Sequence, residues 1–486
     1  MNTPSPVRRR RPRLKPVLLG FGGVALVATL ITVGATGADF TDRGQFNYLV
    51  TMGASTSSPT STPTSTPTST PTSTPTTPPG SGNGVPTQNF SNVHSLARAG
   101  GTLYGWAGAQ ASGVGGYSDS LLPVRVPAGT TFTEIALGPK HNLAIDQNGD
   151  IWGWGYGQTG ALGPYADQPT PVKVVSTATK YRKVAAGGYI NLGTGQNQTG
   201  TSYAIDTNGN LWSWGAWNGG AQTKFHVLGD SAGANRSTPK QVTTGIDFVD
   251  VSVGWDKNMA VARDGSVYAW GSNHMAGLAL SDTYSTSEVV TPTRSPFLAN
   301  IVKVAMGGRT AYALDRDGYV WVWGSKSGTQ SNSTLGIGTT NPGNDKLCKW
   351  SNASEQTTAI AAVCKPLRVG RTSGQAAFTD ISAGESHFYA LDSNGAVWAW
   401  GGNRFGNTGV GTTSNGTTVQ DTLSPTKVDF SVRITAVAAE YFGGVAVDVN
   451  GGVWSWGRTN MNSINLLGDG RSSWPSNAQT TPKKVK

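Results

Sequence analysis

One short segment recurs seven times between residues 100 and 457, and this repetition limits the chain to a repeat architecture. Most copies open with Asn-Gly or Asp-Gly and continue through an aromatic residue, a residue that is mostly small, and a tryptophan. These dipeptides favour type I′ turns, because both turn positions need positive φ angles. Seven β-hairpins are therefore predicted, at GGTLYGWA (100–107), NGDIWGWG (148–155), NGNLWSWG (208–215), DGSVYAWG (264–271), DGYVWVWG (317–324), NGAVWAWG (394–401) and NGGVWSWG (450–457).

Further strand-like segments flank the hairpins. An alternating strand such as NLAID (142–146) precedes each turn, and a segment such as FTEIAL (132–137) comes before it. A proline-centred strand such as TPVKV (170–174) follows. Four strands in about 50 residues are typical of a propeller blade. The sequence therefore predicts an all-β fold, a seven-bladed β-propeller over residues 85–486. The C-terminal strand Thr481–Val485 is predicted to complete the first blade and close the ring.

The composition agrees with many short strands joined by tight turns. Glycine accounts for 66 of the 486 residues, about double its usual share of ~7%. Charged residues make up 13%, roughly half the typical value. This balance excludes a coiled coil and a charged disordered chain, and two cysteines exclude a disulfide scaffold.

The N-terminal segment has the features of an export signal. Residues 1–15 are a basic tail, and residues 16–38 are uncharged and long enough to span a bilayer. They are predicted to be either a signal anchor or a cleaved signal peptide, and both alternatives stay open. Because positive flanks stay in the cytoplasm, the rest of the chain is expected outside it. The predicted location is the cell membrane, with a single span and the propeller outside, or the secreted fraction.

A low-complexity stalk separates this segment from the repeats. Residues 39–53 are a short connector, and residues 54–84 are rich in Ser, Thr and Pro. This composition favours an extended chain with little to bury. The segment is therefore predicted to be a spacer, with a domain boundary near residue 85.

The net charge of +10 is concentrated in the tail. Six positive charges lie there and leave +4 for the remaining residues, which is too dilute for a phosphate-binding surface. No nucleic-acid partner is predicted. The six tail residues are Arg8, Arg9, Arg10, Arg11, Arg13 and Lys15.

The repeats resemble those of the regulator of chromosome condensation family. The resemblance rests on the A-G-x-x-H element at Ala383, Gly384 and His387, followed by A-L-D-x-x-G-x-V-W-x-W-G over residues 390–401. It covers residues 85–486 and implies a propeller, similar in fold to the secreted β-lactamase inhibitor protein of the second type. For function it implies nucleotide exchange, chromatin reading or scaffolding, because the family includes all three.

The loops on one face of such a propeller are the candidate partner-binding site. Aromatic and arginine side chains dominate protein-binding hot spots. For His141 and His387 the alternative role is to fix loops by hydrogen bonds. The candidate partner-binding residues are His141, Tyr189, Trp255, Lys257, Arg309, Glu385, His387, Tyr441 and Phe442.

The other candidate sites have structural interpretations. The W-x-W aromatics are predicted to be core residues rather than carbohydrate platforms, and the Asp-rich turns lack calcium-loop spacing. Cys348 and Cys364 are expected to form a disulfide outside the cytoplasm. Neither a catalytic constellation nor metal-ligand spacing is visible, so no enzyme, metal or cofactor is predicted.

The functional prediction is a monomeric, non-catalytic propeller that binds a protein partner outside the cytoplasm. One alternative is a guanine-nucleotide exchange factor for a small GTPase, by family analogy. A second alternative is an extracellular propeller that binds or cleaves glycans.

Overall fold

The computed structural model describes most of the repeat region and three residues that precede it. The predicted tail (1–15), anchor (16–38) and stalk (54–84) lie outside the described residues. In the part of the chain that is described, no helix is long and apolar enough to cross a membrane. The described residues are 49–51, 94–99, 102–107, 113, 120–126, 128–138, 141–175, 178–188, 200–216, 226–231, 233–243, 245–254, 256–285, 287–326, 334–350, 361–371, 374–411, 421–440, 443–461, 464–471 and 478–486.

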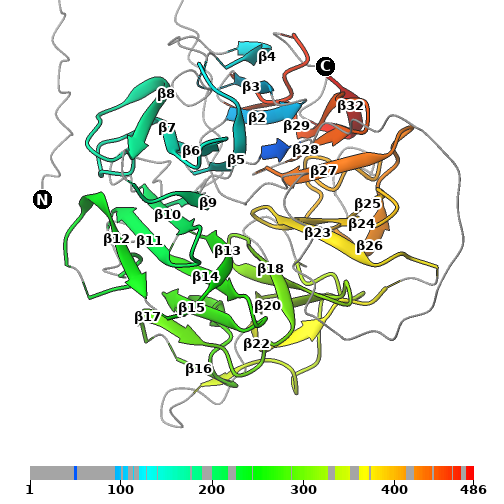
Figure 1. The fold of residues 1–486 in the computed structure, drawn as a ribbon. Helices are drawn as coiled ribbons and strands as arrows, with labels where there is room; N and C mark the ends of the chain where they lie inside the picture. Colours follow the sequence, from blue (N-terminus) through cyan, green and yellow to red (C-terminus); the bar gives the residue numbers. More distant parts are fainter. Residues whose placement is uncertain are drawn as a thin grey trace, which may run out of the picture. The chain divides into compact units, whose positions relative to one another are not determined.

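Six four-stranded antiparallel sheets repeat one strand order, and each corresponds to one predicted unit (Figure 1). Their inner strands are β5 (Phe132–Leu137), β9 (Tyr181–Gly187), β13 (Phe248–Val253), β18 (Ile301–Met306), β23 (Phe378–Ala383) and β27 (Ile434–Ala439). The second strands are β6 (His141–Asp146), β10 (Thr201–Asp206), β14 (Lys257–Ala262), β19 (Thr310–Asp315), β24 (His387–Asp392) and β28 (Gly443–Asp448). The third strands, which carry the W-x-W segment or its Tyr variant, are β7 (Ile151–Gly155), β11 (Leu211–Gly215), β15 (Val267–Gly271), β20 (Val320–Ser325), β25 (Val397–Gly401) and β29 (Val453–Arg458). The outer strands are β8 (Gln168–Val175), β12 (Arg236–Thr243), β17 (Val289–Arg294), β22 (Ala362–Arg368), β26 (Thr422–Lys427) and β32 (Ala478–Lys484).

The first unit forms a sheet of a different kind. Strands β2 (His94–Ala99), β3 (Thr102–Ala107) and β4 (Ser120–Arg125) are antiparallel, but β1 (Leu49–Thr51) joins β2 in parallel. β1 comes from the predicted connector and lies where the other units have their inner strand, next to β27 and β5. The structure thus shows six antiparallel blades, and a seventh blade of the same kind stays a prediction.

The C-terminal strand belongs to the last blade. β32 pairs antiparallel with β29, with Lys484 opposite Trp454. The prediction that Thr481–Val485 completes the first blade is therefore wrong. The physical reason is that the first unit has its own outer strand, β4, which already occupies the free edge of β3.

The inner strands follow one another around an axis. β5 contacts β9, β9 contacts β13, β13 contacts β18, β18 contacts β23, and β23 contacts β27. β1 contacts both β27 and β5 and so connects the last blade to the second unit. This closed succession, visible in Figure 1 as the colour series returning towards its start, is the arrangement of a β-propeller.

Five of the six second strands end in an aspartate, and this residue explains the repeated turn sequence. In the sixth unit one Asp392 oxygen accepts the backbone N–H groups of Asn394 and Ala396, both at 2.9 Å. The other oxygen accepts the Trp398 indole N–H at 2.9 Å. Asp146, Asp206, Asp315 and Asp448 make the same indole contact. These carboxylates are thus used within the turn, and Gly395 supplies its positive φ of 79°.

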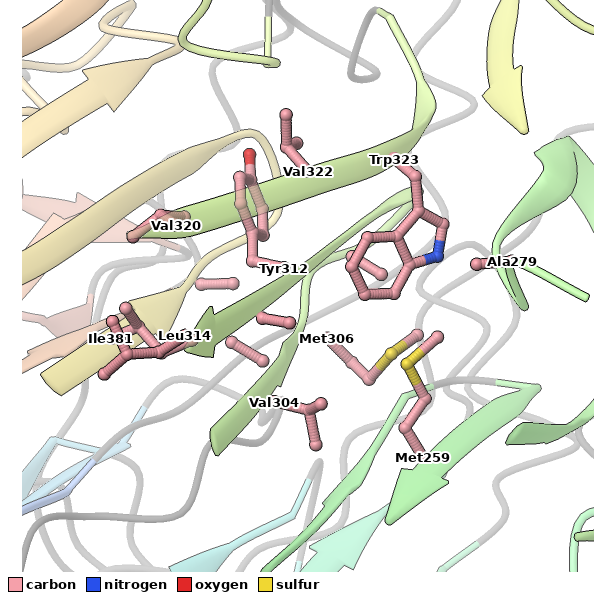
Figure 2. Packing of buried hydrophobic residues seen from close by; sticks show 14 of the residues in the cluster. Met259, Ala279, Val304, Met306, Tyr312, Leu314, Val320, Val322, Trp323 and Ile381 are labelled. Atoms are coloured by element: carbon pink, nitrogen blue, oxygen red, sulfur yellow. The ribbon is translucent and has the colours of Figure 1, made fainter. Parts of the chain in front are cut away.

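The second aromatic of each W-x-W or Y-x-W segment is a core residue, as predicted. Trp106, Trp154, Trp214, Trp270, Trp323, Trp400 and Trp456 are among the largest fully buried side chains of the chain. In Figure 2 the Trp323 indole faces Ala279, and Met259 and Met306 pack side by side below it. These two methionines come from β14 and β18, so the core joins neighbouring blades.

Asp392→Ala is expected to lower the free energy of unfolding by about 2 kcal/mol, because three donors lose their acceptor. Urea denaturation followed by tryptophan fluorescence measures this change. Asp429→Ala is the matched control, since this aspartate lies outside the turn. Equal effects of the two substitutions would contradict the role of Asp392 as the turn acceptor.

Candidate binding face and a buried charge network

The segments of the repeat that vary in length lie at one end of the propeller. In an antiparallel blade, the segments that follow the inner and the third strands emerge at one end, which we name the loop face. The hairpin turns emerge at the other end, the turn face. The segment between β20 and β22 spans residues 326–361, whereas that between β7 and β8 spans only 156–167. Length variation between repeats is thus concentrated on the loop face.

Four of the predicted partner-binding residues lie outside the described residues: Tyr189, Trp255, Tyr441 and Phe442. Arg309 is on the loop face, between β18 and β19, and is half-buried. Its backbone carbonyl accepts the N–H of Ser325 at 2.9 Å, which fixes the loop. Arg309 therefore stays a candidate contact residue.

The two histidines are interior residues. His141 and His387 are each 1% exposed. His141 Nε2 lies 2.9 Å from Ser202 Oγ in the next blade, and His387 Nε2 donates to the Gly443 carbonyl at 2.8 Å. Their side chains therefore join neighbouring blades and do not face a partner. This is the loop-fixing alternative stated for them above.

Lys257 and Glu385 are also buried, at 4% and 1% exposure. Lys257 pairs with Gly271 as His387 pairs with Gly401, so it occupies the histidine position of its own blade. Its ammonium lies 2.8 Å from Asp256. The Glu385 carbonyl accepts the N–H of Gly308 at 3.3 Å. The expectation that these two side chains face a partner is wrong in this structure, because both are inside the packed loops.

Burial gives His387 a pH-dependent effect on stability. It lowers the pKa of His387 from 6.5 to about 4, although the bond to Gly443 opposes this change. A base with a lowered pKa is neutral in the fold, so its contribution is present above about pH 6.5 and is lost as the pH falls towards 4. At 1.4 kcal/mol per pH unit this amounts to about 3 kcal/mol.

The urea midpoint of the chain is therefore expected to fall between pH 7 and pH 4.5, and His387→Thr should reduce that fall. Thr310 occupies the same register position in β19, which makes threonine the matched replacement. An unchanged pH dependence in His387→Thr would show that His387 does not titrate in this way.

The insertions of two neighbouring blades combine on the loop face. Cys348 and Cys364 form the predicted disulfide, with Cα atoms 5.3 Å apart. β16 (Thr283–Tyr284) pairs in parallel with β21 (Lys349–Trp350), and β16 comes from the preceding blade. The disulfide packs against Tyr284 and against Ala276 of the short 3-10 helix η1 (His274–Ala276). The two insertions thus make one structured platform.

A network of buried charges lies on the inner strands, and the sequence prediction did not include it. The third residue of five successive inner strands is charged, and the sign alternates from each strand to the next. We name this set the charge ring. Its members are Glu134, Lys183, Asp250, Lys303 and Asp380.

The ring is held by short ion pairs. Lys183 Nζ lies 3.0 Å from Glu134 and 3.3 Å from Asp250, and Lys303 pairs with Asp380. Burial raises the pKa of Glu134, and the Lys183 ammonium offsets only part of that rise. Burial alone would lower the pKa of Lys183, but two carboxylates facing one ammonium outweigh it, so that pKa is raised. Asp380 has a raised pKa for the same reason as Glu134.

The charged groups of the inner strands and of the turns make their contacts within the fold. The ring carboxylates and ammonium groups are paired with one another, and the turn aspartates are used as turn acceptors. No group of three possible metal ligands occurs in the ranges given above.

Family models match the repeats directly. The description "Regulator of chromosome condensation (RCC1) repeat" fits residues 248–275, 301–328 and 378–407, and a second model of that name fits 264–314 and 394–446.

Curated relatives match over part of their length. The Ultraviolet-B receptor UVR8 of Arabidopsis thaliana is 26% identical over 51% of this chain and 60% of its own. The RCC1-like G exchanging factor-like protein of Mus musculus is 30% identical over 36% and 34%. The Guanine nucleotide exchange factor SRM1 of Saccharomyces cerevisiae is 25% identical over 49% and 51%. The chain thus spans between one third and three fifths of these relatives.

Solved structures share the fold. Prp20p from Saccharomyces cerevisiae, described together with its binding to Gsp1p and histones, superimposes with a TM-score of 0.62. Its identity is 22%, and the match covers 79% of this chain and 85% of that one. Human WBSCR16 superimposes with a TM-score of 0.57 at 17% identity, over 79% and 93%. The chain therefore carries regulator of chromosome condensation repeats, folded as a β-propeller.

Proposed function

We propose that this propeller is a protein-interaction module that binds its partner through the loop face and works outside the cytoplasm. The observation that carries the proposal is the concentration of insertions on one face. In repeat proteins such insertions map to one face, which is often the binding face. The disulfide-bonded platform around Cys348 supports it, because an ordered surface loses less entropy on binding.

The proposed location rests on the N-terminal sequence. The basic tail, the uncharged segment 16–38 and the Ser/Thr/Pro stalk together fit a propeller held away from a membrane or released from it. A disulfide between Cys348 and Cys364 agrees with an oxidising compartment.

A photo-crosslinking residue at two matched positions tests the binding face. Position 309 is on the loop face, and position 208 is an exposed turn-face residue between β10 and β11. We expect a crosslinked protein adduct from position 309 in intact cells and none from position 208. Adducts from position 208 alone would contradict the assignment of the loop face.

The second candidate function is guanine-nucleotide exchange. The similarity to exchange factors from mouse and yeast favours it. Release of a fluorescent guanine nucleotide from small GTPases of the source organism distinguishes the two functions. The interaction-module proposal expects no acceleration by the purified chain, whereas an acceleration that saturates with chain concentration would favour exchange.

A further inference from the structure

The charge ring has a property that ion pairing alone does not explain, which is its strict alternation. Going from β5 to β23, the signs at the third position are minus, plus, minus, plus, minus. Each cation of the ring pairs with an acid from an adjacent inner strand, as Lys183 does with Glu134 at 3.0 Å and Asp250 at 3.3 Å. Glu134, Asp250 and Asp380 are 6%, 5% and 2% exposed. The side chains of Lys183 and Lys303 are 15% and 12% exposed.

The two remaining sheets complete the pattern. β27 carries Ala436 at the third position, and the first sheet supplies Arg98 from β2. Arg98 is 7% exposed, donates to the Phe132 carbonyl of β5 at 2.8 Å, and interacts electrostatically with Glu134. Three cations and three anions therefore face one another.

A ring of seven sheets with alternating charges needs one neutral position, and Ala436 provides it. Alternating signs can close only around an even number of positions, so one position of seven must be neutral. The neutral position is Ala436 of β27. This strand lies between β23, which carries Asp380, and the first sheet, which carries Arg98. The Oδ2 atom of Asp380 is buried and accepts no hydrogen bond. Where β13 packs against β18, by contrast, Asp250 Oδ2 accepts the N–H of Val304 at 3.0 Å.

A gain in the stability of the fold is a weak explanation for the presence of such a buried charge network. Buried ion pairs roughly balance their own desolvation cost, and apolar replacements are often as stable. Specificity is a stronger reason here, because the hairpins and second strands are nearly interchangeable between blades. Repeat proteins with similar neighbours are prone to misassembly and swapping. Like charges placed side by side in the interior oppose such errors.

We propose that the charge ring specifies which blade packs beside which, and so fixes the blade order and the closure of the propeller. Omitting one blade from the succession would bring β5 against β13 and place Glu134 beside Asp250. Omitting the next would bring β9 against β18 and place Lys183 beside Lys303. Within the series from β5 to β23, skipping one blade always joins two charges of the same sign.

Serines on the inner strands fix the register of one inner strand relative to the next. Ser252 Oγ accepts the N–H of Met306 at 3.1 Å, and Ser382 Oγ accepts the N–H of Ala439 at 2.9 Å. The serine bond therefore occurs where β13 packs against β18, both of which carry ring charges. It also occurs where β23 packs against β27, which carries the neutral Ala436. Serine contacts fix the register of adjacent inner strands, and the charges distinguish one neighbour from another.

Refolding of the full chain in detergent tests the proposal. A neutral variant removes the five ring charges and the charge of Arg98 with side chains of similar size: Arg98→Met, Glu134→Gln, Lys183→Met, Asp250→Asn, Lys303→Met and Asp380→Asn. After dilution from guanidinium, light scattering on a sizing column gives the monomer yield. We expect the neutral variant to give at least threefold less monomer than the native chain, with no fall in the Tm of the monomer that forms. An unchanged monomer yield would overturn the proposal.

A second pair of variants decides the question if the neutral variant gives no soluble protein. Exchanging two residues, Lys183→Asp with Asp250→Lys, keeps the charge composition and breaks the alternation. Adding Arg98→Glu, Glu134→Lys, Lys303→Glu and Asp380→Lys restores alternation with every sign inverted. We expect the exchange to lower the monomer yield about tenfold and the inverted ring to recover most of it. Failure of the inverted ring to exceed the exchange variant would overturn the proposal.

Discussion

Trp214→Ala is expected to lower the free energy of unfolding by about 4 kcal/mol, because it empties a fully buried site in the core. The Trp214 side chain packs between neighbouring blades, in one cluster with Leu143 of β6 and Val184 of β9. Its indole N–H donates to the Ala161 carbonyl at 2.9 Å, and alanine would leave that carbonyl with the Ser202 hydroxyl as its remaining donor. Chemical denaturation monitored by circular dichroism measures the loss.

Trp212→Ala is the matched control, because it changes the other aromatic of the same W-x-W segment. Trp212 is half-buried, contacts Tyr181 edge-on and donates to Asp206 at 3.0 Å. Its loss should cost about 2 kcal/mol. Equal losses from the two substitutions would contradict the assignment of one aromatic to the core and the other to the turn.

Lys183→Met is expected to destabilise the chain by about 3 to 5 kcal/mol, because it removes one partner of buried ion pairs and leaves the others uncompensated. Glu134 and Asp250 would then be left without the ammonium that lies between them. Urea denaturation of the variant and the native chain at pH 8 measures the difference.

The pH dependence of this difference provides a further check. An acid whose pKa is raised in the fold stabilises it at low pH, and this contribution is lost as the pH rises through the raised value. Burial already raises the pKa of Glu134 in the native chain, and removing Lys183 removes the opposing charge. The gap between variant and native chain should therefore narrow from pH 8 to pH 5. A gap that is constant with pH would show that the loss comes from packing alone.

The blades were predictable from the sequence because their determinants are local. An aspartate, a glycine three residues later and a tryptophan six residues after the aspartate are enough to form the turn contacts seen at Asp392. The W-x-W spacing places Trp398 and Trp400 on one face of β25. Trp398, next to the turn, donates to Asp392, and Trp400 is fully buried in the core. Each of these interactions is made within one hairpin or with the adjacent sheet.

Closure was harder to predict because it depends on distant segments. The proline-centred C-terminal strand was assigned to the first blade, yet β29 is its partner. β1 is separated from β2 by the whole stalk, and nothing in its three residues marks them as an inner strand. Closure of the ring depends on which sheet edges remain free for pairing. Only the three-dimensional structure shows which edges these are.

The choice of the loop face stays a prediction, whereas the structure corrects several of the side chains chosen on it. Glu385, in the loop after β23, and Lys257, at the start of β14, are both buried. Charge and loop position do not distinguish an exposed residue from one that fixes its own loop. The charge ring could have been found by aligning the inner strands, since Lys183, Asp250 and Lys303 share one position.

The measurement that tests the central claim most directly is protease treatment of intact cells that express the chain with a C-terminal tag. We expect the tag to be lost from intact cells, because the proposed location puts the propeller and its loop face outside the cytoplasm. Sequencing the mature N-terminus in parallel distinguishes an anchored chain, which keeps its Arg-rich tail, from a released one. A tag that survives in intact cells and is lost only after lysis would contradict the account and favour nucleotide exchange.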